Sequence, residues 1–158
     1  MNKETELISP YYFPGLNMKT LNKEKYGFLF KPEDMLLTKD EIMEVVSKQT
    51  GISVKNIISH SRDGNFVMAR YIAFAMLRFK LDIDLIEIGR YIGRDHTTII
   101  HGLTSFIDRY KQEERYKIVS DKVAKYIGVN IEEKIENREK FIEKKLKLGY
   151  AKSKFKTW

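Results

Sequence analysis

Apolar residues recur at intervals of three and four from residue 42 to residue 148, the spacing of amphipathic helices. Thr38 and Glu41 have the spacing of a capping box, and Gly51 follows as a stop signal, which predicts a first helix. Ser53 is expected to cap a short second helix. A third helix is predicted over residues 66–79, after a polar loop at residues 60–65.

The second half of the chain continues this pattern. Asp84 and Glu87 predict the start of a fourth helix, and Gly93 predicts its end. Asp95 is expected to cap a fifth helix that runs from residue 96 to about residue 110. Two further helices are expected over residues 113–127, where Gly128 follows, and over residues 131–148. The pattern therefore predicts an all-α fold.

The fourth and fifth predicted helices are joined by a short glycine turn, which is the helix-turn-helix pattern. In such motifs the second helix enters the major groove of DNA, and its N-terminal residues meet the base edges. Ile99 and Leu103 would face the core, which leaves His96 and Thr97 on the outward face of the first turn. Asp, His and Thr side chains can all contact bases.

Residues 94–101 read Arg-Asp-His-Thr-Thr-Ile-Ile-His and resemble the signature of the C-terminal DNA-binding domain of DnaA, the bacterial replication initiator family. The resemblance extends from about residue 42 to about residue 110, and more weakly to residue 127. Upstream elements that share it are Ile52-x-Val54, a loop arginine at position 62, Val67-x-Ala69-Arg70 and Glu87-Ile88-Gly89.

The resemblance implies a helix-turn-helix domain of the DnaA C-terminal, Trp-repressor-like type. We expect this domain over residues 38–128, with an irregular N-terminal arm at residues 1–37. Residues 129–158 are expected to form a basic helix and tail beyond the domain. The arm contains several aromatic residues, and we expect it to pack on the domain, with partner binding as the alternative.

By resemblance, one set of residues contacts bases and another contacts the DNA backbone. The expected base contacts are Asp95, His96 and Thr97 in the major groove and Arg62 in the minor groove. The expected backbone contacts are Thr98, Arg70, Arg94, Arg90 and Lys55. A carboxylate at position 95 can cap the helix and also accept from an exocyclic amine. A narrow A·T-rich minor groove attracts a guanidinium, although a solvated loop arginine is the alternative for Arg62.

Three departures from the family pattern bear on sequence preference. The loop is less basic, since His60, Ser61 and Gly64 stand where cations are common and Asp63 adds a negative charge. Ala69 stands where the family often has proline. The turn before Arg94 is one residue shorter, which could rotate the recognition helix.

Composition narrows the classes of function. A net charge of +7 suits a polyanionic partner, although basicity alone is weak support. The chain has no cysteine, so disulfides and thiolate metal sites are excluded. His96 and His101 are five residues apart, which does not place two metal ligands on one helix face, and we expect His101 to be buried. No metal or cofactor is therefore expected.

Neither a signal peptide nor an apolar run of about 20 residues appears, so we expect no membrane partner and a cytoplasmic protein, bacterial or phage-encoded. No Walker A loop is present, and no nucleotide is expected. The roughly forty residues before the first predicted helix are too few for the ATPase module that the family carries there.

The sequence thus predicts specific binding of double-stranded DNA at DnaA-box-like sites, in replication initiation, its control or transcriptional regulation. The alternative is an adaptor that binds a replication protein through its aromatic arm or its basic tail, residues 152–158. An enzyme is not expected, because paired carboxylates, a nucleophile constellation and a phosphate loop are all missing from the sequence.

Overall fold

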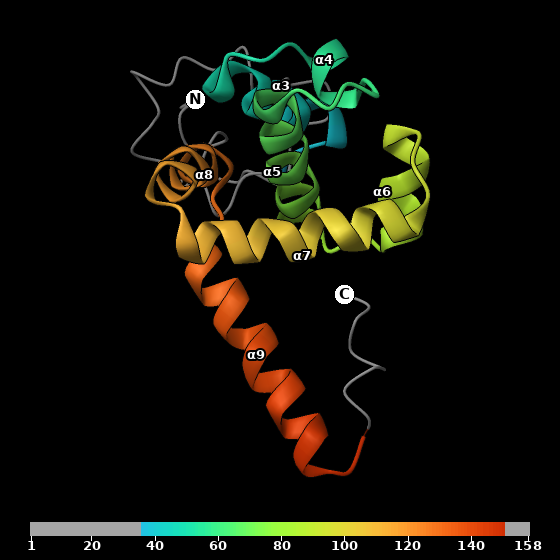
Figure 1. The fold of residues 1–158 in the computed structure, drawn as a ribbon, viewed down its shortest axis with the longest axis vertical. Helices are drawn as coiled ribbons and strands as arrows, with labels where there is room; N and C mark the ends of the chain where they lie inside the picture. The colour runs from blue at the N-terminus through green and yellow to red at the C-terminus, as the bar shows by residue number, and fades with distance from the viewer. Residues whose placement is uncertain (1–35, 151–158) are drawn as a thin grey trace, which may run out of the picture.

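The structure is a computed structural model that describes residues 36–150, and within this range the chain forms helices and no strand (Figure 1). The helices are α3 (Lys39–Thr50), α4 (Val54–Ile58), α5 (Gly64–Leu81), α6 (Leu85–Ile92), α7 (His96–Gln112), α8 (Glu114–Ile127) and α9 (Ile131–Lys147). The predicted all-α fold is confirmed. Residues 1–35 and 151–158 lie outside the described residues, and with them most of the aromatic arm and the basic tail.

Side-chain caps fix where the helices begin. The hydroxyl of Thr38 accepts the backbone N–H of Glu41 at 3.2 Å, and the carboxylate of Glu41 accepts the N–H of Thr38 at 2.8 Å. The carboxylate of Asp84 accepts the N–H of Glu87 at 2.7 Å. These contacts satisfy backbone donors that have no partner within the helix. The predicted starts of α3 and α6 are therefore correct.

The third predicted helix starts earlier than the sequence indicated. α5 begins at Gly64 and not at residue 66, because the side chain of Asp63 accepts the backbone N–H of Asn65 at 3.0 Å and acts as the cap. The polar segment between α4 and α5 is therefore shortened to residues 59–63. We call these residues the α4–α5 loop.

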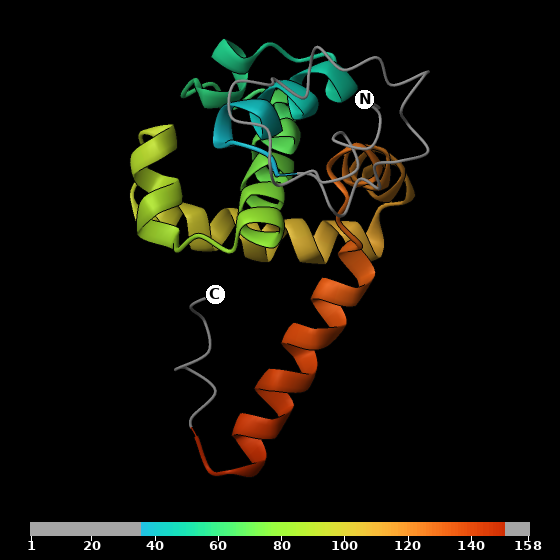
Figure 2. The same ribbon diagram turned by 180° about the vertical axis from the view of Figure 1, so that it is seen from behind.

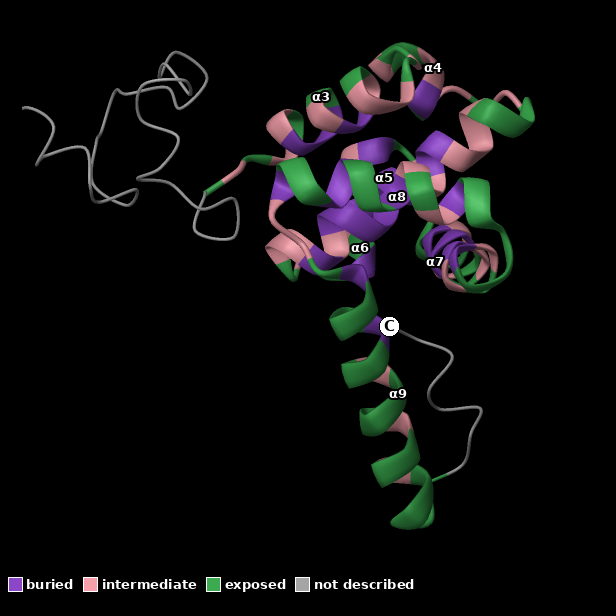
Figure 3. Cartoon of the chain, turned by 90° about the vertical axis from the view of Figure 1, so that its left-hand side faces the viewer, coloured by how far each residue is buried: buried purple, intermediate pink, exposed green. Residues whose placement is uncertain are grey.

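The core is built around α5, which lies between α3, α7 and α8 (Figures 1 and 3). Aromatic rings fill the space between α5, α7 and α8. The ring of Phe106 lies 6.2 Å from that of Phe79, 5.9 Å from that of Tyr110 and 5.7 Å from that of Tyr116. Such pairs stabilise a core by about 0.5–1.5 kcal/mol each beyond the area that they bury. They anchor the C-terminal half of α7.

Helix α9 extends away from the other helices (Figures 1 and 2). Only its first turns are buried, at Ile131 and Ile135. Lys117 pairs with Glu132 at 2.8 Å, and Lys111 pairs with Glu139, which ties this first half of α9 to α7 and α8. The rest of the helix is mostly exposed (Figure 3).

Gly102 of α7 packs against two aromatic side chains of α5. A Cβ atom at this position would lie 2.6 Å from Cδ2 of Phe74 and 2.9 Å from Cδ1 of Tyr71. The Phe74 side chain is fully buried. Glycine at position 102 therefore leaves room for the aromatic rings of α5 to pack directly against the backbone of α7.

We expect Gly102→Ala to lower the free energy of unfolding by about 1–3 kcal/mol, the usual cost of overpacking a core. Gly64→Ala is the matched control, because a Cβ atom at Gly64 meets nothing within 4 Å. Urea unfolding of both variants measures the effect. Equal stability of the two variants would contradict the close approach of α5 and α7.

Candidate nucleic-acid interface

The turn between α6 and α7 contains only Gly93, Arg94 and Asp95. Gly93 has a φ angle of 78°, in the left-handed region that glycine adopts without strain. The carbonyl oxygen of Gly89 accepts the N–H groups of both Gly93 and Arg94 at 2.8 Å. A Cβ atom at Gly89 would lie 2.4 Å from the carbonyl oxygen of Arg94. The short turn therefore packs directly onto Gly89.

The first turn of α7 presents polar side chains to solvent. Asp95, His96 and Thr97 are exposed and adjacent, whereas Ile99 and Leu103 are fully buried against the core. The sequence analysis predicted this division between an outward first turn and an inward apolar face, and it is correct. The side chain of Thr98 is partly buried beside the cap.

Asp95 caps α7 through one carboxylate oxygen, which accepts the backbone N–H of Thr98 at 2.8 Å. This hydrogen bond, together with one from the Thr98 side chain, holds the pKa of Asp95 below its ordinary value of 3.8. The carboxylate is fully exposed and has further lone pairs available for a partner. The capping role is thus compatible with a second contact.

Arg62 lies on the α4–α5 loop and is exposed. Within residues 36–150 its guanidinium makes no hydrogen bond or ion pair. Side chains of the loop order the backbone on both sides of Arg62. The hydroxyl of Ser59 accepts the N–H of Ser61 at 3.4 Å, and the hydroxyl of Ser61 accepts the N–H of Asp63 at 3.2 Å. Among the described residues, Arg62 is therefore an unpaired cation on a loop whose backbone is held by hydrogen bonds.

Arg70, which was expected to contact the DNA backbone, binds the protein's own backbone in this structure. Its side chain is only 7% exposed, and it donates to the carbonyl oxygens of Ile57 at 2.7 Å, Ser59 at 2.6 Å and Ser61 at 3.0 Å. Burial first, and the positive charge of Arg94 second, lower its pKa. Arg70 therefore holds the α4–α5 loop in place. In the free chain these bonds engage Nε and Nη2 of the guanidinium, and the predicted contact of Arg70 with phosphate stays a prediction.

The remaining predicted cations differ in their surroundings. Arg90 on α6 and Lys55 on α4 are exposed. Arg94 is partly buried, and its Nη2 atom donates to the carbonyl oxygen of Ser59 at 2.5 Å. The predicted residues therefore gather around the helix-turn-helix and the α4–α5 loop, although two of the arginines bind the protein backbone.

His101 was expected to be buried, and this expectation is wrong. The residue is exposed because it lies almost opposite Ile99 around α7, and Ile99 faces the core. Its ring lies edge-on to the ring of Tyr71, with centroids 6.3 Å apart.

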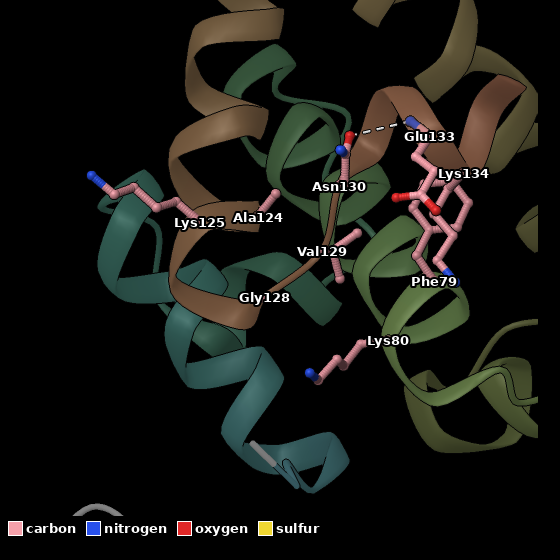
Figure 4. A pocket seen from close by; sticks show the side chains of 9 residues that line it. All are labelled: Phe79, Lys80, Ala124, Lys125, Gly128, Val129, Asn130, Glu133 and Lys134. Carbon is pink, nitrogen blue, oxygen red and sulfur yellow. Dashed lines mark hydrogen bonds between the residues drawn. The ribbon is translucent and has the colours of Figure 1, made fainter. Parts of the chain in front are cut away.

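A cavity of about 670 Å³ lies where α5 ends and α8 turns into α9 (Figure 4). Its lining includes Lys80, Lys125 and Lys134, with Glu133 as the only carboxylate among the lining residues. The side chain of Asn130 accepts the N–H of Glu133 at 3.2 Å there. Because α6 lies at one end of α7 and α8 at the other (Figure 2), this cavity is remote from the helix-turn-helix and contains none of the predicted site residues.

The fold and the turn define a helix-turn-helix domain. Residues 39–105 match the family described as "Bacterial dnaA protein helix-turn-helix". The resemblance that the sequence analysis identified is therefore confirmed for this part of the chain. The match covers 67 of the 158 residues.

Several curated proteins are similar to the same region. The chromosomal replication initiator protein DnaA of Leptospira biflexa is 27% identical over 96 residues, which is 61% of this chain and 20% of that protein. DnaA of Herpetosiphon aurantiacus is 35% identical over 82 residues, 51% of this chain and 17% of the other. DnaA 1 of Chlamydia muridarum is 28% identical over 88 residues, 56% and 19% of the two chains. The match thus spans about a fifth of the length of these relatives.

None of the helices between residues 36 and 150 has the length and apolar content needed to cross a membrane.

The cap at Asp95 predicts a specific dependence of stability on pH. A carboxyl group whose pKa is lower in the folded state stabilises the fold above its unfolded pKa, and this contribution disappears as the pH falls through the folded value. The ordinary pKa is 3.8 and the folded pKa is lower, so the loss begins near pH 4 and continues below it.

We expect the difference in Tm between the unmodified chain and Asp95→Asn to be positive at pH 6 and to shrink towards pH 3. Asparagine keeps the capping acceptor but cannot be protonated in this range, and every other carboxyl group is common to both proteins. Thermal unfolding followed by circular dichroism at several pH values measures the difference. A constant difference across this range would show that the charge of Asp95 does not stabilise α7.

Proposed function

We propose that this chain binds double-stranded DNA in a sequence-specific manner, at A·T-rich sites of the DnaA-box type. The observation that carries the proposal is the first turn of α7, where Asp95, His96 and Thr97 are exposed together while Ile99 and Leu103 anchor the helix. A helix held in this way can enter the major groove with its N-terminal residues against the base edges.

Each of these side chains has a chemically matching group on a base edge. The methyl group of Thr97 can pack against a thymine methyl, and the carboxylate of Asp95 can accept from the amino group of cytosine or adenine. His96 lies between them and can reach neighbouring edges. In this proposal Arg62 enters the adjacent minor groove, where a narrow A·T-rich segment concentrates negative potential.

Cations and hydroxyls around the turn would position the domain on the DNA backbone. Arg90, Lys55 and Thr98 are proposed for phosphate contacts, since Arg90 and Thr98 lie on either side of the turn and Lys55 lies on α4. The phosphate contacts of Arg70 and Arg94 stay a prediction, since both side chains bind backbone carbonyls in this structure. Such contacts supply affinity but carry no base information. The net charge of +7 suits this role.

The relatives are named chromosomal replication initiators, which supports a role in replication initiation or its control. We place this role in the cytoplasm of a bacterium or of a phage-infected cell. The adaptor alternative depends on the aromatic arm and the basic tail, which lie outside the described residues. It therefore stays a prediction, and so does the absence of nucleotide binding.

An electrophoretic mobility-shift titration tests the proposal, with a short duplex that carries a DnaA box and a scrambled duplex of equal base composition. Each mismatched base pair in a specific site costs about 1–3 kcal/mol, so the box duplex should bind at least tenfold more tightly. Equal affinity for the two duplexes at the same salt concentration would contradict sequence-specific binding.

We expect Thr97→Ala to weaken binding to the box duplex by about 1–3 kcal/mol, because a methyl contact and a hydroxyl are lost from a base edge. Thr104→Ala is the matched control, since Thr104 is exposed on α7 about 10 Å further from the turn. Binding to scrambled DNA should change little in either variant. An equal loss on box and scrambled DNA would show that Thr97 does not read bases.

We expect Arg62→Ala to weaken binding most where the site is flanked by A·T-rich DNA, because a wide minor groove attracts a guanidinium less strongly than a narrow one. Arg115→Ala removes the same charge from an exposed position on α8 and serves as the control. Titrations with A·T-rich and G·C-rich flanks measure the difference. Equal losses on both flanks would assign Arg62 to a phosphate and not to the minor groove.

A further inference from the structure

The C-terminal end of α4 exposes carbonyl groups that have no partner within the helix, and two arginines from distant parts of the chain bind them. Arg70 of α5 donates to Ile57 and Ser59, at 2.7 and 2.6 Å. Arg94, in the turn before α7, donates to Ser59 at 2.5 Å and to Ile58 at 3.3 Å. Both guanidinium groups therefore meet at the carbonyl oxygen of Ser59.

Arg94 joins three elements through one residue. Its backbone N–H donates to Gly89 of α6 at 2.8 Å, and its next residue, Asp95, caps α7. Its side chain reaches back 35 positions to Ser59 at the start of the α4–α5 loop. The helix-turn-helix and the loop that carries Arg62 are thus fastened together at Arg94.

A second contact of Arg94 is with His60, whose two ring nitrogens lie 2.7 Å from Nη1. Nη1 is equally far from both nitrogens, so this branch of the guanidinium lies against the imidazole ring as a whole. The two branches of the guanidinium are therefore engaged separately, one by the backbone of the loop and one by a loop side chain. Only a forked donor group can bind both at once.

Two positive charges side by side repel each other, and the arrangement needs a compensating negative potential. The carbonyl end of a helix supplies it, because the peptide dipoles of α4 point their negative ends towards both arginines. The guanidinium groups of Arg70 and Arg94 are therefore held by carbonyl groups that would otherwise lack partners. A bound phosphate is not needed to explain the position of Arg94.

We propose that Arg94 is a positioning residue that holds the α4–α5 loop, and with it Arg62, at a fixed place relative to the first turn of α7. Major-groove and minor-groove contacts are then made by one rigid unit. The DNA part of this inference rests on the proposed function. The attachment of the loop through Arg94 does not depend on DNA binding, and it is tested separately in the free protein.

Hydrogen exchange of the free chain, followed by NMR, tests the attachment. Arg94→Lys keeps the charge but loses the fork, so the amides of Ser61 and Asp63 should exchange on the order of tenfold faster, the effect of losing charge-assisted hydrogen bonds. Arg90→Lys is the control and should leave these amides unchanged. Unchanged exchange in Arg94→Lys would overturn the proposal.

A double-mutant cycle on the box duplex tests the consequence for DNA. If Arg94 acts by positioning Arg62, most of the affinity lost in Arg94→Lys should already be lost in Arg62→Ala, so the two losses should not add. The losses from Arg90→Ala and Arg62→Ala should add. Additive losses for Arg94→Lys and Arg62→Ala would assign Arg94 to an independent contact and overturn its positioning role.

The proposed function and the attachment of the loop can fail independently. If the unmodified chain does not prefer the box duplex, the proposed function fails, while the exchange measurement still decides whether Arg94 holds the loop.

If Arg94→Lys unfolds below the working temperature, His60→Ala replaces it in the exchange measurement. This variant removes an exposed side chain and with it one of the two contacts of the Arg94 guanidinium. Faster exchange at Ser61 and Asp63 is expected there too, and no change would overturn the proposal.

Discussion

The packing of α7 on α5 sets the position of the residues that α7 contributes to the proposed DNA-binding surface. Gly102 allows the two helices to approach until the ring of Phe74 occupies the space of a missing side chain. Ile99, Leu103 and Phe106 then hold one face of α7 in the core. Because the helix is anchored along this face, its first turn is left exposed without being mobile relative to the core, which is what a base-reading helix requires.

A second constraint connects this helix to the loop that bears Arg62. The short turn folds onto Gly89, and this places Arg94 where its side chain reaches the end of α4. Arg70 approaches the same carbonyl group from α5. Contacts with the two grooves of DNA are separated by a fixed distance in the duplex, so a rigid connection between loop and helix avoids the entropic cost of ordering them upon binding.

Local signals were sufficient to predict most of the fold. The capping box at Thr38 and Glu41, the cap at Asp95 and the left-handed glycine at position 93 each act within a few residues, so the sequence shows them directly. The start of α5 was placed two residues late because Asp63-Gly-Asn is also typical of a turn. The outward position of His96 and Thr97 followed from the apolar period of α7.

Roles that depend on tertiary contacts were not predictable in the same way. Arg70 has the sequence context of a phosphate contact, but its burial depends on α4 folding over α5, which no local pattern shows. The spacing around α7 did contain the signal that His101 lies off the buried face. The coupling of Arg94 to Ser59 spans 35 positions and emerges only when the helices are packed.

We propose that the loop and the recognition helix contact DNA together. Titration of the isotopically labelled chain with the box duplex, followed by amide chemical shifts, tests it most directly. The account predicts that amides of residues 95–98 and of residues 59–63 shift in parallel and reach saturation at the same duplex concentration. Shifts confined to α7, or centred on the lysine-lined cavity between α5, α8 and α9, would contradict it.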